Sequence, residues 1–273
     1  MTTAFKFGAD PELFLKDRTT GQFISAETRD GPLIPGTKAR PYAVRNGAVQ
    51  VDGVAAEFNI DPTDNFEQFF TNITSVVGQM KDMIIRKNPN ASLVPTPTAR
   101  FDKRYFDSLP AHTLELGCEP DFNAYKEGQA NPRPQTTEPF RTGSGHVHIS
   151  WLSEGNYADP NYKGHIADCC LVAQQLDKYL LGLSKSWDDD NLRRTLYGAP
   201  GSFRPKKYGM EYRPLSNAWL RNKDTIHKVF YTTLGVLRGL DSAKLDLEHK
   251  FAATTKPEEH MYPVLSFVPE YYN

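Results

Sequence analysis

The sequence predicts an α+β protein whose sheet is mostly antiparallel. Short extended segments, separated by turn residues, dominate the first part of the chain, and long amphipathic helical patterns are inserted between the later ones. At 273 residues, the chain is long enough for one large domain or two small ones with a substantial buried core. No internal repeat and no low-complexity tract interrupts this pattern.

The amino-terminal part predicts two hairpins. Extended segments at 5–7, 12–16 and 22–25 form the first, with a turn over 17–21. Residues 27–43 are rich in glycine, proline and charge and are expected to form a loop. Asn46-Gly47 is a typical two-residue turn, and it predicts a second hairpin with strands at 48–51 and 54–60.

The clearest helix follows these hairpins. Apolar residues recur at three-and-four spacing from Phe66 to Ile84, and Thr63 or Asp64 is positioned to cap the helix. The pattern ends at Lys87-Asn-Pro89. A strand at 92–96 is expected next, and then a region of strand and loop through residue 123.

The carboxyl-terminal half alternates loops, strands and helices. Three prolines predict a mobile loop over 126–139, and the Gly/Pro/basic composition predicts another loop over 198–207. Strands are expected at 146–150 and 210–214. Helices are expected from Ile166 to Leu180 and over 189–197, 219–240 and 242–252.

Composition excludes several classes of protein. The net charge of −1 gives no reason to expect binding to nucleic acid or to a membrane surface. No apolar run approaches the ~20 residues of a transmembrane helix, and the first residues resemble no secretory signal. The three cysteines, Cys118, Cys169 and Cys170, are unlike a disulfide framework, so a cytoplasmic location is expected.

Three extended segments place charged or metal-ligating residues two positions apart. They are Asp10-Pro-Glu12, His146-Val-His148 and Glu211-Tyr-Arg213, and Glu57 stands among apolar neighbours in a fourth. In a strand, residues two apart share one face, so Ser150 belongs with the two histidines. Each segment alone also fits a simpler interpretation, as a solvated turn acid, a packed or surface histidine, a half-exposed strand face or a paired buried acid.

Together these segments predict a polar cleft. A buried carboxylate needs a cation or a hydrogen-bond donor, and carboxylate and imidazole ligands suit Mg²⁺ or Mn²⁺. The sequence has no P-loop, no Gly-x-Gly-x-x-Gly motif after a strand and no Gly-x-Ser-x-Gly elbow. Arg204, Lys206 and Lys207 are therefore the candidates for holding phosphate, although a basic surface loop explains them equally well.

These segments resemble those of a known superfamily. Phe7-Gly-Ala-Asp-Pro-Glu-Leu-Phe-Leu15 is similar to the Gly-x-Glu-x-Glu-Phe-Phe-Leu strand of glutamine synthetases, and Gly143-Ser-Gly-His-Val-His-Ile-Ser150 to their Gly-Ser-Gly-x-His-x-His-x-Ser strand. Glu211-Tyr-Arg-Pro-Leu-Ser-Asn217 resembles their Glu-x-Arg-x-Pro-Asp stretch, and the order along the chain agrees. Leu116-Gly-Cys-Glu-Pro-Asp121 is similar to a segment of the shorter carboxylate–amine ligases, in particular the phage-associated COOH-NH2 ligase type 2 group.

The resemblance implies a single catalytic domain over 1–273, in which a curved antiparallel sheet forms a funnel and helices pack outside. It implies two or more Mg²⁺ (or Mn²⁺) ions, with Asp10 and Glu12 on different ions, Glu57 completing the first site, and His146 and Glu211 completing the second. His148 and Ser150 would contact the nucleotide. Arg213 and Arg204 would take up charge on the transferred phosphoryl group, with Lys206 and Lys207 on phosphate.

The sequence also departs from the family pattern. Asp10 replaces the usual first glutamate, and Asp52 is the nearest counterpart of the second glutamate of the middle strand. The Gly-Ser-Gly-His run is one residue short, which leaves open whether His146 or His148 binds metal. The amino-terminal domain of glutamine synthetases has no counterpart before residue 7, so a homo-oligomer, if formed, is expected to assemble differently, and the oligomeric state stays open.

The reaction implied by the resemblance is ATP-dependent amide formation. A substrate carboxylate is activated as an acyl phosphate and then attacked by an amine, with loops 27–43 and 126–139 as candidate covers. The carboxylate, the amine and the general base stay open, with Glu119 and Asp121 as candidates for the base. A metal-dependent hydrolase or nuclease is the alternative enzyme, and a noncatalytic binding module on the same fold is the other alternative.

Overall fold

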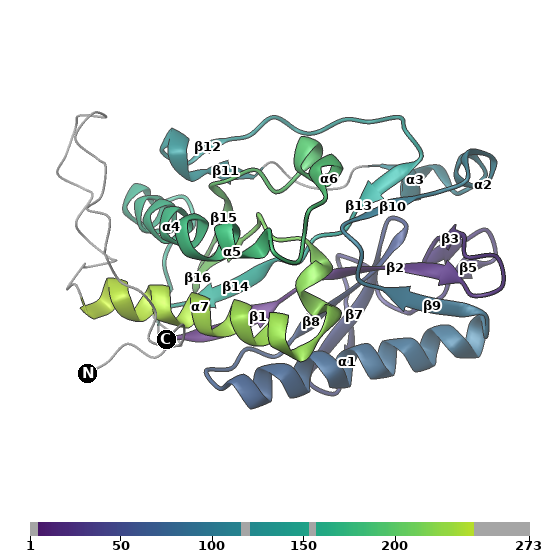
Figure 1. Cartoon of the computed structure of the whole chain (residues 1–273), viewed down its shortest axis with the longest axis horizontal. Helices are drawn as coiled ribbons and strands as arrows, with labels where there is room; N and C mark the ends of the chain where they lie inside the picture. The colour runs from purple at the N-terminus through teal and green to yellow at the C-terminus, as the bar shows by residue number, and fades with distance from the viewer. Residues whose placement is uncertain (1–4, 116–120, 153–156, 243–273) are drawn as a thin grey trace.

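A computed structural model describes residues 5–115, 121–152 and 157–242 (Figure 1). It confirms the mixed α and β class: the named strand pairs are all antiparallel, and the sheets are curved. No helix in these ranges has the length and apolar character needed to cross a membrane.

One six-stranded sheet carries the histidine segment. Its order is β1 (Lys6–Ala9), β14 (Val147–Ser150), β16 (Gly209–Tyr212), β15 (Ser202–Lys206), β11 (Phe122–Asn123) and β12 (Gln129–Ala130). Along β14 and β16 the side chains alternate, so that Val147, Ile149, Met210 and Tyr212 enter the hydrophobic core. The opposite face therefore carries the polar residues of these strands.

The second sheet holds the two acidic segments near the amino terminus. Its order is β3 (Phe23–Ile24), β2 (Glu12–Asp17), β8 (Ala55–Ile60), β7 (Gly47–Asp52) and β6 (Tyr42–Val44), with β9 (Ala91–Val94) also pairing with β2. Asn46 and Gly47 have positive φ values and turn the chain between β6 and β7, as the sequence predicted. Two small ribbons pair β4 (Glu27–Thr28) with β5 (Gly31–Pro32) and β10 (Thr98–Arg100) with β13 (Phe140–Thr142).

Helices and helical turns lie between the strands along the chain. They are α1 (Phe66–Lys87), α2 (Lys103–Asp107), α3 (Ala111–Leu114), the 3-10 helix η1 (Ala124–Lys126), α4 (Lys163–Leu176), the π-helix η2 (Asp177–Leu181), α5 (Gly182–Ser184), α6 (Asn191–Leu196), the 3-10 helix η3 (Asn217–Arg221) and α7 (Lys223–Ser242). Helix α1 packs on β7, β8 and β9, and α4 packs on β15 and β16.

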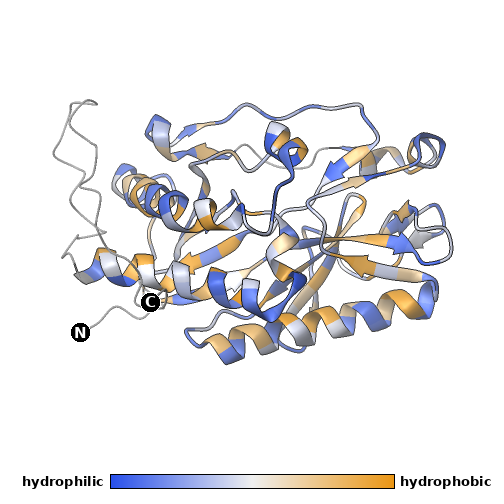
Figure 2. Cartoon of the chain, in the orientation of Figure 1, coloured by the Kyte–Doolittle hydropathy of each residue, from blue (hydrophilic) through white to orange (hydrophobic). Residues whose placement is uncertain are grey.

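The amphipathic pattern of α1 is confirmed. Asn65, rather than Thr63 or Asp64, caps the helix by accepting a hydrogen bond from the Gln68 N–H. Apolar and polar residues alternate along the helix in Figure 2, and Phe69 packs against Phe230 of α7 with ring centroids 5.3 Å apart. Phe230 also meets Phe7 of β1 at 5.0 Å, so α7 joins α1 to the first sheet.

The opening segment crosses from one sheet to the other. The prediction of a single hairpin is wrong for its first strand, because β1 pairs with β14, whereas β2 pairs with β3 across the predicted turn. Between them, the Asp10 N–H donates to the His146 carbonyl at 3.4 Å and the Glu12 N–H to the Ser144 carbonyl at 3.0 Å. The Phe58 N–H of β8 donates to the Pro11 carbonyl at 3.2 Å, so this short connection touches both sheets.

The prediction of a loop over 198–207 is wrong for its second half. Residues 202–206 form β15, in which Pro205 lies opposite Met210 and beyond the end of the short strand β11. A proline is tolerated there because its missing N–H removes no bond to a neighbouring strand. The loops expected at 27–43 and 126–139 contain the short strands β4, β5, β6 and β12.

The later helices differ from expectation at their ends. The helix predicted over 219–240 is η3 followed by α7, and Asn222 accepts a hydrogen bond from the Thr225 N–H at their junction. The α4 helix continues into η2 and α5. The helix predicted over 242–252 lies outside the described residues apart from its first.

A buried arginine ties together the segments on either side of the polar face. Arg193 of α6 is 1% exposed. Its Nε donates to the Gly143 carbonyl at 3.2 Å, and its Nη1 and Nη2 donate to the Pro214 and Leu215 carbonyls at 2.8 Å each. These carbonyls flank His146 and Arg213 in the chain, so Arg193 fixes the spacing between their strands.

We expect Arg193→Met to lower the free energy of unfolding by about 3 kcal/mol or more, because it removes three buried hydrogen bonds donated by a charged group. Urea unfolding followed by circular dichroism measures this loss. The exposed Arg104 of α2 offers a matched control, for which Arg104→Met should cost under about 0.5 kcal/mol. Equal losses in the two variants would contradict the role of Arg193.

A second anchor is a carboxylate between η2 and β16. Asp177 Oδ1 accepts a hydrogen bond from the Tyr212 hydroxyl at 2.7 Å, and Oδ2 accepts one from the Gly201 N–H at 2.5 Å. Burial raises the pKa of Asp177 to about 6, although hydrogen bonds from Tyr212, Tyr125 and Gly201 lower it in part. The folded protein therefore binds a proton here more tightly than the unfolded chain does.

The raised pKa of Asp177 makes the free energy of unfolding depend on pH. Because the folded-state pKa is raised, ionisation of Asp177 opposes folding as pH rises from the unfolded value of 3.8 to about 6. Relative to Asp177→Asn, the wild type should therefore lose about 1–3 kcal/mol of unfolding free energy across this window. Urea unfolding of both proteins at several pH values measures the difference, and a difference that stays constant with pH would refute the assignment.

Candidate functional site

A row of polar side chains crosses the first sheet on the face away from the core. Gly8, His148, Glu211 and Arg204 occupy paired positions on β1, β14, β16 and β15. Paired residues of antiparallel strands project to the same face. Glu211 lies at the centre of the row and is 0% exposed, with Lys206 Nζ at 3.0 Å and Arg204 Nη1 at 3.6 Å from its Oε2.

A second row crosses the other sheet. Glu12 of β2, Glu57 of β8 and Gln50 of β7 occupy paired positions. The Gln50 Nε2 donates to Glu57 Oε2 at 2.7 Å, and the Ser144 N–H donates to Glu12 Oε2 at 3.2 Å. Glu57 is therefore a buried acid whose carboxylate accepts a hydrogen bond from a neutral amide and forms no ion pair with a basic side chain of the described residues.

Asp10 joins the first row at the crossing between the sheets. Its Oδ1 lies 3.1 Å from His148 Nε2 and 3.4 Å from His146 Nδ1. His146 Nδ1 is also 3.2 Å from Glu211 Oε1 and 3.3 Å from Arg213 Nη1. The structure thus brings together Asp10, His146, His148, Glu211 and Arg213, which the sequence pattern had indicated separately.

Within this group, Asp10, His148 and Glu211 have the geometry of a metal-binding triad. One ligand atom from each lies within 4.8 Å of the other two. Asp10 Oδ1, His148 Nε2 and Glu211 Oε2 are also buried atoms that form no hydrogen bond of regular geometry within the described residues. An ion with oxygen and nitrogen ligands would satisfy all three.

The two histidines have different surroundings. His148 Nδ1 hydrogen-bonds the Tyr208 hydroxyl, which holds the ring with Nε2 toward Asp10. His146 instead contacts the Arg213 guanidinium through Nδ1. Of the two histidines that the sequence left undecided, His148 is the one whose ring nitrogen belongs to the triad.

The pKa values of the buried carboxylates are shifted in opposite directions in the two rows. Burial raises the pKa of Glu211, but Arg213, His146 and His148 outweigh burial and hold it well below its usual range. In the second row, burial and then repulsion from Asp10, Asp52 and Glu12 raise the pKa of Glu57 well above its usual value. Burial and the charge of Asp52 raise the pKa of Glu12 as well. The second row therefore lacks positive charge that the first row has.

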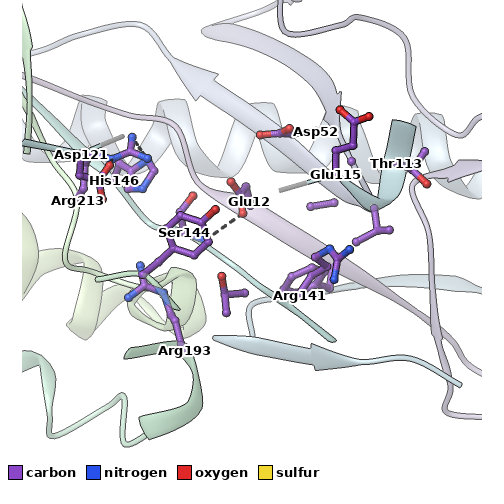
Figure 3. Close-up of a pocket in the computed structure, with 16 residues that line it drawn as sticks. Glu12, Asp52, Thr113, Glu115, Asp121, Arg141, Ser144, His146, Arg193 and Arg213 are labelled. Atoms are coloured by element: carbon purple, nitrogen blue, oxygen red, sulfur yellow. Dashed lines mark hydrogen bonds and ion pairs between the residues drawn. The ribbon is translucent and has the colours of Figure 1, made fainter. Parts of the chain in front are cut away.

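A pocket of about 630 Å³, part of it open to solvent, adjoins the second row (Figure 3). It is lined by Glu12, Asp52, Glu115, Asp121, Arg141, Ser144, His146, Arg193 and Arg213, together with small and apolar residues. Figure 3 shows Glu12 between the His146 and Arg213 side chains and that of Arg141. Its charged and hydroxyl side chains make it a candidate binding site for a small polar molecule.

Other predicted site residues lie farther along the strands. Ser150 follows His148 on the same face of β14, and its hydroxyl donates to the Leu152 carbonyl at 3.2 Å. Lys207 lies just past β15, with its ammonium 4.6 Å from the centroid of the Tyr157 ring. Glu119 falls outside the described residues, whereas Asp121 forms an ion pair with Arg213.

Sequence reasoning missed several residues of the site. Tyr208 sits in the turn between β15 and β16, and no local pattern separates it from other tyrosines. Arg141 stands two residues before the Gly-Ser-Gly turn, where its charge was a possible signal. Arg193 lies in the predicted helix over 189–197, and its role depends on tertiary contacts alone.

Comparison of the sequence with known proteins identifies no relative. No model of a protein family matches the chain, and no curated protein matches it.

The triad predicts a divalent cation site that direct binding can test. Mn²⁺ reports binding through loss of its free-ion electron paramagnetic resonance signal. His148→Asn should weaken Mn²⁺ binding by at least about tenfold, because it removes the imidazole ligand. His112→Asn is the matched control, since His112 Nε2 also pairs with a carboxylate, Glu27, at 3.0 Å but is exposed. Equal affinities in the two variants would exclude the triad.

Proposed function

We propose that the protein is an ATP- and Mg²⁺-dependent ligase that joins a carboxylate to an amine through an acyl phosphate. The observation that carries this proposal is the arrangement of the two rows: acidic and imidazole ligands meet at Asp10-Pro11-Glu12, and Arg204 and Lys206 lie on the same face. The proposal also rests on the resemblance of the three segments to those of glutamine synthetases.

The residues present fit the expected metal ions. Asp10, His148 and Glu211 would hold one ion, and Glu12 and Glu57, with Asp52 nearby, offer carboxylates for another. Mg²⁺, or Mn²⁺ in its place, offsets the repulsion between an anionic carboxylate and the phosphates of ATP. The raised pKa values of Glu12 and Glu57 support this assignment, because burial and then repulsion by neighbouring carboxylates disfavour their charged forms without a cation.

The cationic residues divide into two groups by their contacts. Arg204 and Lys206 approach Glu211 from β15 and are part-exposed, so both are positioned to meet phosphate oxygens. Arg213 is 3% exposed and is held by Glu211, Asp121 and His146. Its guanidinium is therefore preorganised beside the triad, where charge develops during phosphoryl transfer.

The adjoining pocket supplies the place for an organic substrate. Glu12, His146 and Arg213 belong to the pocket wall, and His146 and Arg213 also touch the triad group. A carboxylate that enters from the pocket would reach the metal ligands without crossing the sheet. The curved sheets that carry the two rows are compatible with the funnel that the resemblance implies.

A nucleotide-consumption assay tests the proposal. The purified protein is incubated with ATP, Mg²⁺ and pooled amino acids or polyamines, and ADP release is followed. Substrate-stimulated ADP release is expected, and Glu211→Gln and Glu12→Gln should each lower it by at least about a hundredfold, as expected for removed ligands of catalytic metal ions. Glu67→Gln, an exposed change on α1, should leave it intact.

Two outcomes favour the alternatives. Hydrolysis of a phosphodiester or peptide with Mn²⁺ and without ATP would indicate a metal-dependent hydrolase or nuclease. If a folded protein showed no ADP release and no nucleotide-dependent thermal shift, the noncatalytic binding module would be the remaining interpretation.

A further inference from the structure

The pocket contains a buried arginine whose charge is not balanced by a carboxylate. Arg141 of β13 is 7% exposed, and no carboxylate of the described residues lies within ion-pair distance of its guanidinium. Its Nη1 donates to the carbonyls of Phe140 at 2.7 Å and Glu138 at 3.2 Å, and its Nη2 donates to the Leu114 carbonyl. Carbonyls satisfy these N–H groups but bring no negative charge.

The remaining surfaces of the guanidinium limit where an anion can bind. The Phe106 ring covers one face, with its centroid 4.6 Å from Arg141 Cζ. The Nε–H has no partner within the described residues, although it is buried. An anion that binds along the Nε edge would satisfy this donor and neutralise the charge. Burial also lowers the pKa of Arg141, which an anion would reverse.

A second buried donor lies in the same pocket. The Ser144 hydroxyl forms no hydrogen bond of regular geometry within the described residues, although it lowers the pKa of Glu12 in part, and the Ser144 backbone N–H donates to Glu12. Ser144 and Arg141 both line the pocket, and a hydroxyl donates well to a carboxylate. Buried polar groups usually have partners, so two donors on one wall of a pocket are positioned to meet an anion.

The rest of the pocket restricts the ligand further. Glu12, Asp52 and Glu115 also line it, and we call these three carboxylates the acidic wall. Figure 3 shows them as side chains separate from the Arg141 guanidinium. A ligand with two carboxylates would be repelled by the acidic wall, whereas a ligand with an ammonium at its other end would be attracted.

We infer that this pocket binds an α-amino acid, with its carboxylate on Arg141 and Ser144 and its ammonium facing the acidic wall. The role of the bound amino acid rests on the proposed ligase function, in which it is the amine substrate. Its binding requires neither ATP nor turnover, so it can be measured by itself.

Binding is tested on the full chain without nucleotide. Each proteinogenic amino acid is screened by thermal shift, and the best is titrated by isothermal calorimetry beside its carboxamide and its N-acetyl derivative. The amino acid should bind, and both derivatives should bind at least about thirtyfold more weakly, as expected when one partner of a buried charge pair is removed. Equal binding of the carboxamide, or no binding by any amino acid, overturns the inference.

Variants then locate the carboxylate. Arg141→Met should weaken binding of that amino acid by at least about thirtyfold, and Ser144→Ala by about five- to tenfold. The matched control is Arg100→Met, because Arg100 lies on the neighbouring strand β10 but is exposed. If Arg141→Met fails to fold, Ser144→Ala and the carboxamide comparison still decide. Unchanged affinity in a folded Arg141→Met variant refutes the site.

The outcome is separable from that of the proposed function. Amino acid binding without any ADP release would keep the site and reject the ligase. ADP release with another amine, together with no amino acid binding, would keep the ligase and reject this inference.

Discussion

The site depends on one short connection that belongs to both sheets. Asp10, Pro11 and Glu12 leave β1 and enter β2, and three backbone hydrogen bonds fasten them to residues 144 and 146 on one side and to β8 on the other. Proline fixes its own φ and donates no hydrogen bond, so this connection has little freedom to adopt another path. The carboxylates on either side of Pro11 are therefore directed into different rows, although they are only two residues apart.

The two rows differ in how their buried charge is balanced. Glu211 is surrounded by arginine, lysine and histidine side chains and stays ionised despite complete burial. Glu57 has an amide partner and acidic neighbours, so its ionised form is disfavoured. A buried ion pair adds little to stability once the loss of hydration is counted. The arrangement therefore accords with the proposed binding of charged ligands and adds little to folding stability.

The sequence predicted local structure well and long-range structure poorly. Period-two alternation identified the strand at His146 and His148, and the Asn46-Gly47 turn identified the β6–β7 hairpin, because both signals are local. Pro205 and the glycines around it suggested a loop, since the partner strand that accommodates β15 is not visible locally. The resemblance indicated one polar cleft with Asp10, Glu211 and both histidines, but it placed His146 on the metal and His148 on the nucleotide, whereas His148 belongs to the triad. Arg141 and Tyr208 acquire their roles only through contacts far along the chain.

The sheet order also has a consequence for synthesis of the chain on the ribosome. The second sheet is complete once residue 94 has been made, whereas β1 at the start of the chain waits for β14, and the full row needs β16. Domains and subdomains begin to fold in the order in which they are made. The acidic row of Glu12 and Glu57 is thus able to assemble while Arg204 and Lys206 are still untranslated, and the edge of β1 that pairs with β14 stays open until residues 147–150 have been made.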